Sequence, residues 1–181
     1  NEWLIQCDNN QDIIATNLII TSGVNSKEFQ FFEELPLIPV KGQLSIFKSD
    51  IEFPYQQAVS ALGYYASLDC TTFVAGSTYE HRFEHENPDE YGAEYVSNRL
   101  FKIIPELVGH AKLLQQWSGV RASTPDRMPI VGTHPTIGNC YTLCGLGSKG
   151  LLYSSILGEE LASHIINKTT IPLEVHINRF Y

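Results

Sequence analysis

The chain has 181 residues, of which 43% are hydrophobic and 18% are charged, and its formal net charge is −8. This length and apolar content are enough for one domain of ordinary size with a real core. The acidic balance argues against a broad face for nucleic acid, because affinity for phosphates depends on Lys and Arg. No stretch reaches the roughly 18 apolar residues of a membrane span, and no signal peptide is recognisable. A cytoplasmic protein without a membrane partner is therefore expected.

The first 35 residues predict a hairpin followed by a buried strand. Residues 3–6 and 13–15 are short apolar runs around the polar turn 8–11, which is typical of two paired strands. Leu18–Thr21 is an apolar run of the kind found in parallel sheets. Taken alone, the following Ser22–Gly23 is best interpreted as a simple turn at the end of that strand.

Residues 37–83 form a β-rich block in the sequence. Strands are predicted over 37–47, 58–67 and 71–79, because β-branched and aromatic residues lie there between turn signals. A helix is then predicted from Asn87 to Ile104, with apolar residues at helical spacing and Pro105 as its stop. These patterns indicate an antiparallel sheet with one long helix.

The last third contains a glycine-rich turn between a strand and a helix. Cys140–Cys144 is predicted as a buried strand, Gly145–Gly150 matches the pattern GxGxxG, and a helix is predicted from Leu151. A complete dinucleotide unit also needs a returning strand and an acidic residue about 20 residues further on. The chain has no room for them after Pro172. The turn alone therefore indicates a close approach of helix and strand, and its late position suggests part of a longer protein.

An ordered set of short segments connects these elements to a known family. The chain resembles the FAD-dependent amine oxidoreductases of the D-amino-acid oxidase type. It is most similar to the FAD-dependent oxidoreductase half of bifunctional tRNA 5-methylaminomethyl-2-thiouridine biosynthesis proteins. The segments that carry the resemblance span almost the whole chain: Leu18–Gly23, Leu37–Ser45, Gly63–Tyr65, Gly76–Tyr79, Gly119–Gly132, Gly145–Leu151 and Asn178–Phe180.

The resemblance implies an α+β fold in three segments. Residues 1–35 would end a first FAD-binding segment, and residues 36–122 would form an antiparallel β-sheet substrate-binding domain with a helix. Residues 123–181 would supply the C-terminal strands and helix of a split FAD-binding α/β domain. In that family Ser22–Gly23 would let the backbone pass close to the dinucleotide. The resemblance implies two partners, a missing N-terminal FAD-binding half and a fused methyltransferase domain. This chain alone is therefore expected to be inactive and to bind FAD weakly or not at all.

Arg121 and Tyr64 are the candidate substrate-binding residues. An N-substituted glycine carries a planar carboxylate, which a guanidinium can hold through paired donors. The resemblance implies this role for Arg121, and it implies that the Tyr64 hydroxyl reaches the same carboxylate. Without the resemblance, Arg121 could equally be tied to Asp126 or to strand carbonyls, and Tyr64 could pack on a sheet face. Asp126 itself is interpreted as a turn-capping residue, in a returning loop over 124–132 that prolines stiffen.

The glycine-rich turn supplies the candidate cofactor-binding residues. The start of a helix exposes unpaired N–H groups and partial positive charge, which suit the pyrimidine edge of a reduced flavin. Lys149 could add a full charge there or could simply be an exposed lysine at a helix start. The candidate residues are Gly145, Leu146, Gly147, Ser148, Lys149, Gly150 and Leu151.

The resemblance implies oxidation of a secondary amine with FAD as the cofactor. Hydride would pass from the glycine unit to the flavin, and the imine would hydrolyse to glyoxylate and a shorter amine. The implied substrate is carboxymethylaminomethyl-uridine at the wobble position of tRNA. A small-molecule glycine, sarcosine or D-amino-acid oxidase or dehydrogenase is the alternative, and a non-catalytic domain of the same fold is the third. No catalytic acid or base is predicted, since positioning and the cofactor suffice.

Neither the cysteines nor the histidines predict a metal site. The four cysteines form no CxxC pair, and buried, reduced thiols are favoured over a disulfide or a metal centre. His81 and His85 have i, i+4 spacing but no third ligand in their polar segment, so no metal is expected. The cysteines are Cys7, Cys70, Cys140 and Cys144.

Overall fold

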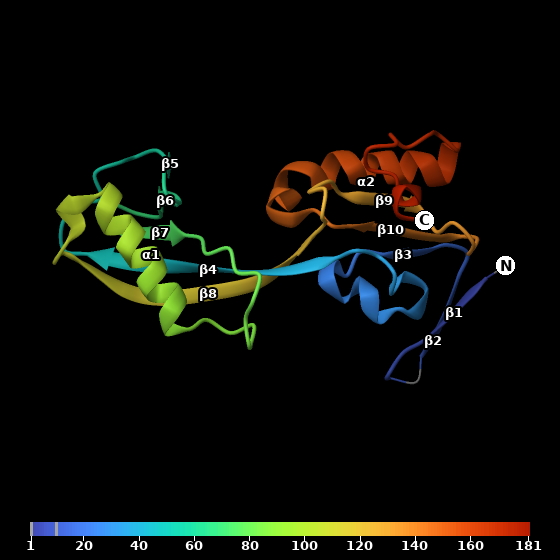
Figure 1. Ribbon diagram of the computed structural model, residues 1–181, viewed down its shortest axis with the longest axis horizontal. Coiled ribbons are helices and arrows are strands. Elements are labelled where there is room, and N and C mark those ends of the chain that lie inside the picture. The colour runs from blue at the N-terminus through green and yellow to red at the C-terminus, as the bar shows by residue number, and fades with distance from the viewer. Residues whose placement is uncertain (1, 10) are drawn as a thin grey trace. The chain divides into compact units, whose positions relative to one another are not determined.

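The computed structural model describes residues 2–9 and 11–181, and the chain has a mixed α+β fold in two units (Figure 1). One unit combines Asn1–Pro39 with Arg121–Tyr181, and the other is the continuous stretch Val40–Val120. We call them the split unit and the continuous unit. Residue 10, in the predicted hairpin turn, lies outside the described residues.

The split unit begins with the predicted hairpin. Strands β1 (Trp3–Gln6) and β2 (Asp12–Ala15) are antiparallel, with Trp3 opposite Ala15. The indole Nε1 of Trp3 donates a hydrogen bond of 3.0 Å to the carbonyl oxygen of Asn139. This bond ties the hairpin to the segment that leads into the sheet of the same unit.

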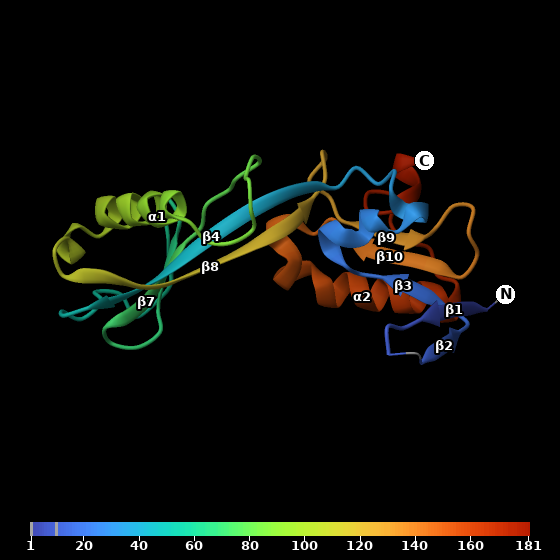
Figure 2. The same cartoon turned by 90° about the horizontal axis from the view of Figure 1, so that it is seen from below.

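The sheet of the split unit has three strands in the order β3-β10-β9. Strand β3 (Leu18–Ile20) runs parallel to β10 (Cys140–Cys144), and β9 (Ile130–Thr133) runs antiparallel to β10. Helix α2 (Gly150–Asn167) covers one face of this sheet, and the 3₁₀ segments η1 (Gly23–Glu28) and η2 (Gln30–Phe32) lie on the other (Figure 2). The sheet is thus buried on both faces, as expected for strands with nearly continuous apolar sequences.

Alternation along β10 separates two cores in the split unit. Cys140 and Cys144 pack with Ile20 and with Phe32 of η2, whereas Tyr141 packs with residues of α2. There are two further 3₁₀ segments in this unit. Segment η4 (Gly147–Lys149) directly precedes α2, and η5 (Ile177–Phe180) lies next to the C-terminal residue.

The continuous unit contains a five-stranded sheet with one long helix across a face (Figure 2). Its strand order is β5-β6-β7-β4-β8, and the pairs β5–β6, β6–β7 and β7–β4 are antiparallel. Helix α1 packs on the face that holds Phe47, Phe73 and Tyr65, and the short segment η3 follows it. The bounds are β4 (Ile38–Ser49), β5 (Val59–Ser60), β6 (Tyr64–Ser67), β7 (Thr72–Gly76), α1 (Glu90–Ile103), η3 (Pro105–Leu107) and β8 (Ala111–Ser123).

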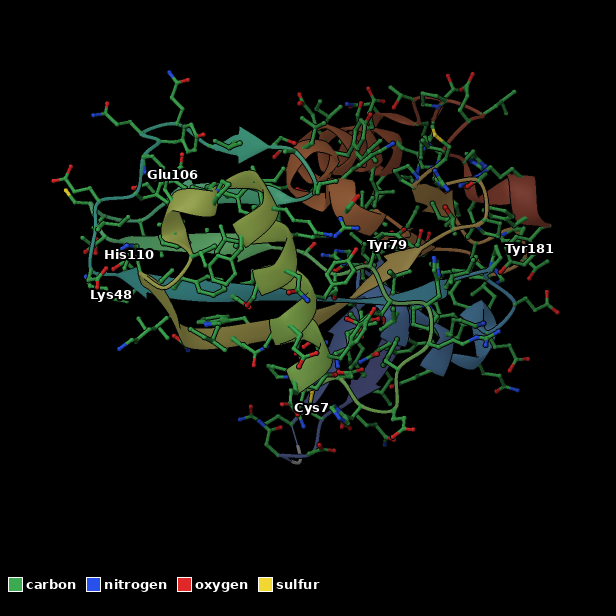
Figure 3. All side chains as sticks on the ribbon, turned by 60° about the vertical axis from the view of Figure 1, so that its left-hand side comes forward. Cys7, Lys48, Tyr79, Glu106, His110 and Tyr181 are labelled. Atoms are coloured by element: carbon green, nitrogen blue, oxygen red, sulfur yellow. The ribbon has the colours of Figure 1, made fainter. Side chains whose placement is uncertain are left out.

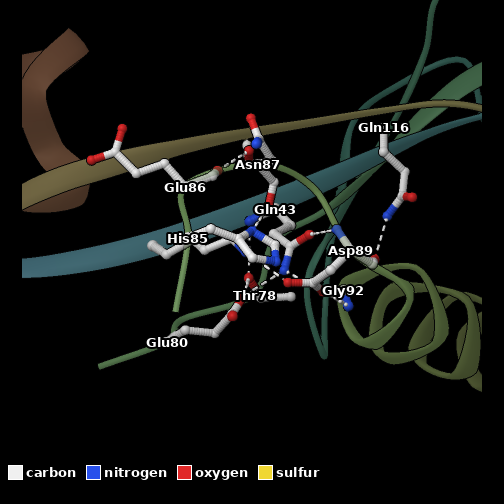
Figure 4. A network of polar contacts seen from close by, with 11 residues as sticks. Gln43, Thr78, Glu80, His85, Glu86, Asn87, Asp89, Gly92 and Gln116 are labelled. Carbon is white, nitrogen blue, oxygen red and sulfur yellow. Dashed lines mark hydrogen bonds and ion pairs between the residues drawn. The ribbon is translucent and has the colours of Figure 1, made fainter. Parts of the chain in front are cut away.

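A buried polar network fixes the start of α1 (Figure 4). The Asp89 carboxylate caps the helix by accepting from the Gly92 N–H at 2.9 Å, and it accepts from Lys41 Nζ at 2.7 Å. Gln43 Nε2 bridges Asp89 and Glu80, at 2.9 and 3.0 Å. Lys41 is only 1% exposed, so this ion pair satisfies a cation that would otherwise be costly to bury.

Several predicted elements differ from the structure. The strand predicted over 58–67 is wrong, because the chain turns at Ala61–Gly63 and forms the two short strands β5 and β6. The strand predicted over 71–79 is shorter, at Thr72–Gly76. Strand β8 was not predicted, and β9 lies in the segment interpreted as a loop. The predicted helix over 87–104 is confirmed as α1, with Asp89 as its N-cap.

Candidate active site

Two strand ends of the split unit meet at one edge of its sheet. Because β3 and β10 are parallel, their carboxyl ends lie at the same edge, with Ile20 opposite Thr142. Ser22–Gly23 follow β3, and the glycine-rich turn follows β10. In open α/β sheets, ligands bind in the crevice outside the carboxyl ends of the strands. This edge is therefore the place to look for a cofactor contact in this unit.

The glycine-rich turn needs its first two glycines for conformational reasons. Gly145 and Gly147 have φ values of +69° and +55°, in the left-handed region that favours glycine. A Cβ on Gly145 would lie 2.8 Å from Cγ2 of Thr124. The hydroxyl of Thr124 is held in turn by a 2.8 Å hydrogen bond to the Met128 carbonyl oxygen. The backbone thus approaches its neighbours more closely than any side chain would permit.

Helix α2 begins without a side-chain cap among the described residues. No described side chain therefore competes with another acceptor at this helix start. Leu151 in this turn is 98% exposed, and Leu152 is exposed as well. Lys149 is exposed, with its Nζ 5.9 Å from the ring centroid of Tyr153. The helix start thus combines polar donors, apolar side chains and one nearby cation.

Arg121 lies on β8 close to this turn. Its side chain is half-buried, and its Nη1 atom is shielded from solvent. Ser123, two residues further along the strand, has its Oγ 3.7 Å from the position that a Cβ on Gly147 would take. Side chains two residues apart point to the same side of a strand and are separated by about 7 Å. Arg121 therefore lies on the same side of β8 as the residue that touches the glycine-rich turn.

Asp126 is held by Arg179. Arg179 Nε donates to Asp126 Oδ2 at 2.8 Å, and Nη2 donates to Oδ1 at 3.4 Å. Asp126 also accepts from the Met128 N–H at 3.0 Å, so its interpretation as a turn-capping residue is confirmed. Hydrogen bonding by Arg179 lowers the pKa of Asp126 to about 2. The partner of this carboxylate is thus Arg179. In the sequence, this arginine stood out only as part of a segment that carries the family resemblance.

Tyr64 lies in the continuous unit, on the sheet face opposite α1. It pairs with Gly76 across β6 and β7 and is 39% exposed. A Cβ on Gly76 would lie 2.9 Å from the Tyr64 hydroxyl and 3.0 Å from Cβ of Leu44. The absence of a side chain at Gly76 therefore lets the Tyr64 ring lie across β7, with its hydroxyl on the open face of the sheet.

The thiols are only partly as predicted. Cys140 and Cys144 are buried, and burial raises the pKa of each thiol to about 11, so both are protonated at neutral pH. The expectation of burial is wrong for Cys70, which is exposed, and Cys7 is half-buried. Within residues 2–9 and 11–181, no three His, Cys, Asp or Glu residues gather as a metal site would require. The described helices include none that is long and apolar enough to cross a membrane.

A family model provides the decisive comparison. The model of the FAD dependent oxidoreductase family, DAO, matches residues 2–164. The chain belongs to this family. Its members bind FAD, and the edge at β3 and β10 fits such a cofactor, because the uncapped start of α2 offers N–H donors beside exposed apolar side chains.

Individual relatives within the DAO family cover most of this chain. The tRNA 5-methylaminomethyl-2-thiouridine biosynthesis bifunctional protein MnmC of Acinetobacter baylyi is 29% identical over 87% of the chain and 26% of its own length. Glycine oxidase of Pseudomonas putida is 29% identical over 66% of the chain and 32% of its own length. The structure of glycine oxidase from Bacillus cereus matches with a TM-score of 0.79 at 20% identity, over 92% of this chain and 46% of that one. The chain thus spans about a quarter to a third of the length of these two curated relatives.

Two residues next to the turn were missed by sequence reasoning. Ser123 and Thr124 contact the positions of Gly147 and Gly145, and both are buried. The sequence did not point to them, because polar and apolar residues do not alternate over 111–123 and no strand was predicted there. The roles of Arg121, Tyr64 and Gly145–Leu151 stay predictions.

Proposed function

We propose that this chain is the C-terminal part of an FAD-dependent oxidoreductase that oxidises the secondary amine of an N-substituted glycine. The proposed substrate is carboxymethylaminomethyl-uridine at the tRNA wobble position. In this proposal residues 36–122, which include Arg121 and Tyr64, form the substrate-binding domain, and residues 1–35 and 123–181 form part of the FAD-binding domain. The relatives that support the tRNA substrate are the MnmC proteins of Acinetobacter baylyi and Maricaulis maris, which are 29% and 30% identical over 87% and 84% of the chain.

The observation that carries the proposal is the position of Arg121. Its guanidinium is half-buried, its Nη1 atom is shielded from solvent, and it lies on the strand that touches the glycine-rich turn. Such a group is better placed to bind a carboxylate than to stay hydrated. Its paired donors match the two oxygens of a glycine carboxylate. Arg121 would thereby bind the substrate and orient its α-carbon toward the cofactor. Tyr64, in the continuous unit, would be the second substrate-binding residue.

Gly145–Leu151 would hold the flavin edge of FAD. The first-turn N–H groups of α2 would donate to it, and Leu151 and Leu152 would cover part of its apolar surface. When bound, FAD supplies the two-electron oxidation of the amine. The residues of this chain contribute binding and orientation, and no side chain among them is assigned as a catalytic acid or base.

The split unit supports a further partner, an N-terminal FAD-binding half outside this chain. Strand β3 is the edge of its sheet, and Ile19 on it is exposed. The outward side of α2 is apolar and exposed at Leu152, Ile156 and Ile166. A helix that is apolar on two sides is normally buried on both. We expect the 181-residue chain alone to be inactive. We also expect it to be colourless, which the visible absorbance of the purified chain will test.

A small-molecule glycine, sarcosine or D-amino-acid oxidase is the second candidate. Its specific support is the glycine oxidase match, with a TM-score of 0.79. Such an enzyme would use the same Arg121 contact, because its substrates carry the same carboxylate. A fused methyltransferase domain would favour the tRNA substrate instead.

Flavin reduction tests the proposal and separates the two candidates. The whole flavin-loaded protein is mixed anaerobically with an anticodon stem-loop that carries carboxymethylaminomethyl-uridine, or with sarcosine, and flavin bleaching is followed. We expect faster reduction by the RNA. The Arg121→Lys variant should lose about a hundredfold in kcat/KM, because a lysine cannot pair with both oxygens. Bleaching by sarcosine alone would select the second candidate, and bleaching by neither would reject both.

A further inference from the structure

An exposed aromatic pair lies in the segment of the continuous unit that joins β7 to α1. Tyr79, labelled in Figure 3, is 51% exposed, and its ring centroid lies 5.2 Å from that of His81 in an edge-to-face arrangement. Arg82, the next residue, is exposed too. The segment thus presents two aromatic rings and one cation to its surroundings.

This aromatic pair stands on a rigid base. The N–H of Glu80 donates to the Lys41 carbonyl oxygen at 2.9 Å, and the Lys41 N–H donates back to Glu80 at 3.0 Å. One residue pair away, the Thr78 N–H donates to the Gln43 carbonyl oxygen at 3.0 Å. Because strand β4 holds the backbone on both sides of Tyr79, little conformational entropy would be lost when a ligand stacks on its ring.

The hydrogen bonds also define the direction of the pair. Thr78 and Glu80 turn their side chains toward Gln43 (Figure 4). The Thr78 hydroxyl accepts a hydrogen bond from the Gln43 N–H, and the Glu80 carboxylate accepts one from Gln43 Nε2. Side chains alternate along an extended segment, so Tyr79 and His81 point to the other side, away from α1. That side of the sheet is the open one on which Tyr64 lies. The two rings therefore extend the face that carries a proposed substrate-binding residue.

We propose that Tyr79 and His81 form a stacking platform for an unpaired base of an RNA substrate. This inference rests on the proposed function, in which the oxidised amine is attached to a uridine. Single-stranded bases stack on aromatic side chains with little dependence on sequence. The net charge of −8 repels RNA in general, so stacking suits this chain better than a broad basic patch. Arg82 can contact one phosphate beside the stacked base.

Binding and turnover of the RNA test the platform in the whole flavin-loaded protein. Anaerobic binding of a fluorescently labelled anticodon stem-loop is measured by anisotropy for the wild type, Tyr79→Ala and Tyr79→Phe. We expect Tyr79→Ala to weaken binding about tenfold or more, as for the loss of one base stack, and Tyr79→Phe to stay within about twofold, because the ring remains. Reduction of the flavin by sarcosine should not change in either variant.

Tyr91→Ala is the matched control, since Tyr91 is 59% exposed on α1, on the other side of the sheet. Its RNA binding should equal that of the wild type. Equal RNA binding by Tyr79→Ala and the wild type would overturn the platform even if the RNA is oxidised. If both Tyr79 variants lower thermal stability and leave RNA binding intact, the ring packs against another part of the protein and the platform is wrong. RNA binding that depends on the Tyr79 ring without RNA oxidation would retain the platform and reject the proposed function.

Discussion

The two long helices of this protein differ at their starts and on their outward sides. Helix α1 begins at a capping carboxylate, Asp89, which is bound to the buried Lys41, and its inward residues pack on the sheet. Helix α2 begins after a glycine-rich turn without a side-chain cap, and its outward residues include the exposed Leu152 and Ile156. A capped amphipathic helix is complete within its own unit. The start and the outward apolar side of α2 are therefore where the proposed cofactor and FAD-binding half would bind.

The largest expected effect is at the start of α1. Asp89→Ala removes the cap and leaves Lys41 buried without its ion-pair partner, so we expect a loss of about 3 kcal/mol in the free energy of unfolding. Asp89→Asn keeps a capping oxygen and should cost less. Urea denaturation measures both. Glu90→Ala, one residue further on and exposed, is the control, and an equal loss there would contradict the role of the network.

The start of α2 should respond through its backbone. Gly145→Ala places a side chain at φ +69° and against Thr124, and we expect a loss of about 1–3 kcal/mol in the free energy of unfolding together with weaker FAD binding. Gly158→Ala within α2 is the matched control. A Cβ there meets nothing within 4 Å, so the better helix propensity of alanine should stabilise the protein by about 0.5–1 kcal/mol. Equal signs for the two substitutions would contradict this account.

Acid should weaken the protein in two steps. Hydrogen bonds from Lys41, Gln43 and the helix start outweigh desolvation and lower the pKa of Asp89 to about 2. Its stabilising contribution is therefore present above its ordinary pKa of about 3.9 and is lost as the pH falls toward 2.

His176, in the split unit, behaves differently. Desolvation, with the nearby His164 and Arg179, lowers its pKa. Its contribution is present above the ordinary histidine pKa of about 6.5 and is lost as the pH falls toward the lower folded value, because the unfolded chain gains the proton first. Urea midpoints between pH 7 and pH 2 will show both steps. His176→Asn should remove the first step, and its persistence would assign that step to another group.

The smallest effect on stability is expected on the outward side of α2. Ile156→Gln replaces an exposed side chain, so the free energy of unfolding of this chain should change by less than about 0.5 kcal/mol. In the whole protein the same substitution should lower flavin content, because it would weaken the proposed apolar contact with the FAD-binding half. A large loss of stability in the chain alone would show that this side is already packed.

Local sequence patterns predicted the helices better than the strands. Asp89 followed by apolar residues at helical spacing and then Pro105 marks α1, since capping and periodicity are local signals. The strand predicted over 58–67 was wrong because its pairing is interrupted at Gly63, where a Cβ would lie 2.5 Å from the Gly76 carbonyl oxygen. Strand β8 was missed because its apolar residues do not alternate, and only its place beside β4 in the sheet makes it a strand.

The sequence by itself determined the glycine-rich turn, the start of α1 and the family, because each depends on residues that are neighbours in the chain. Tertiary structure alone decided that Ser123 and Thr124 contact that turn, that Arg179 holds Asp126, and that Gly76 makes room for the ring of Tyr64. These contacts join residues far apart in the chain. Their geometry follows from sheet register and packing, which no local pattern encodes.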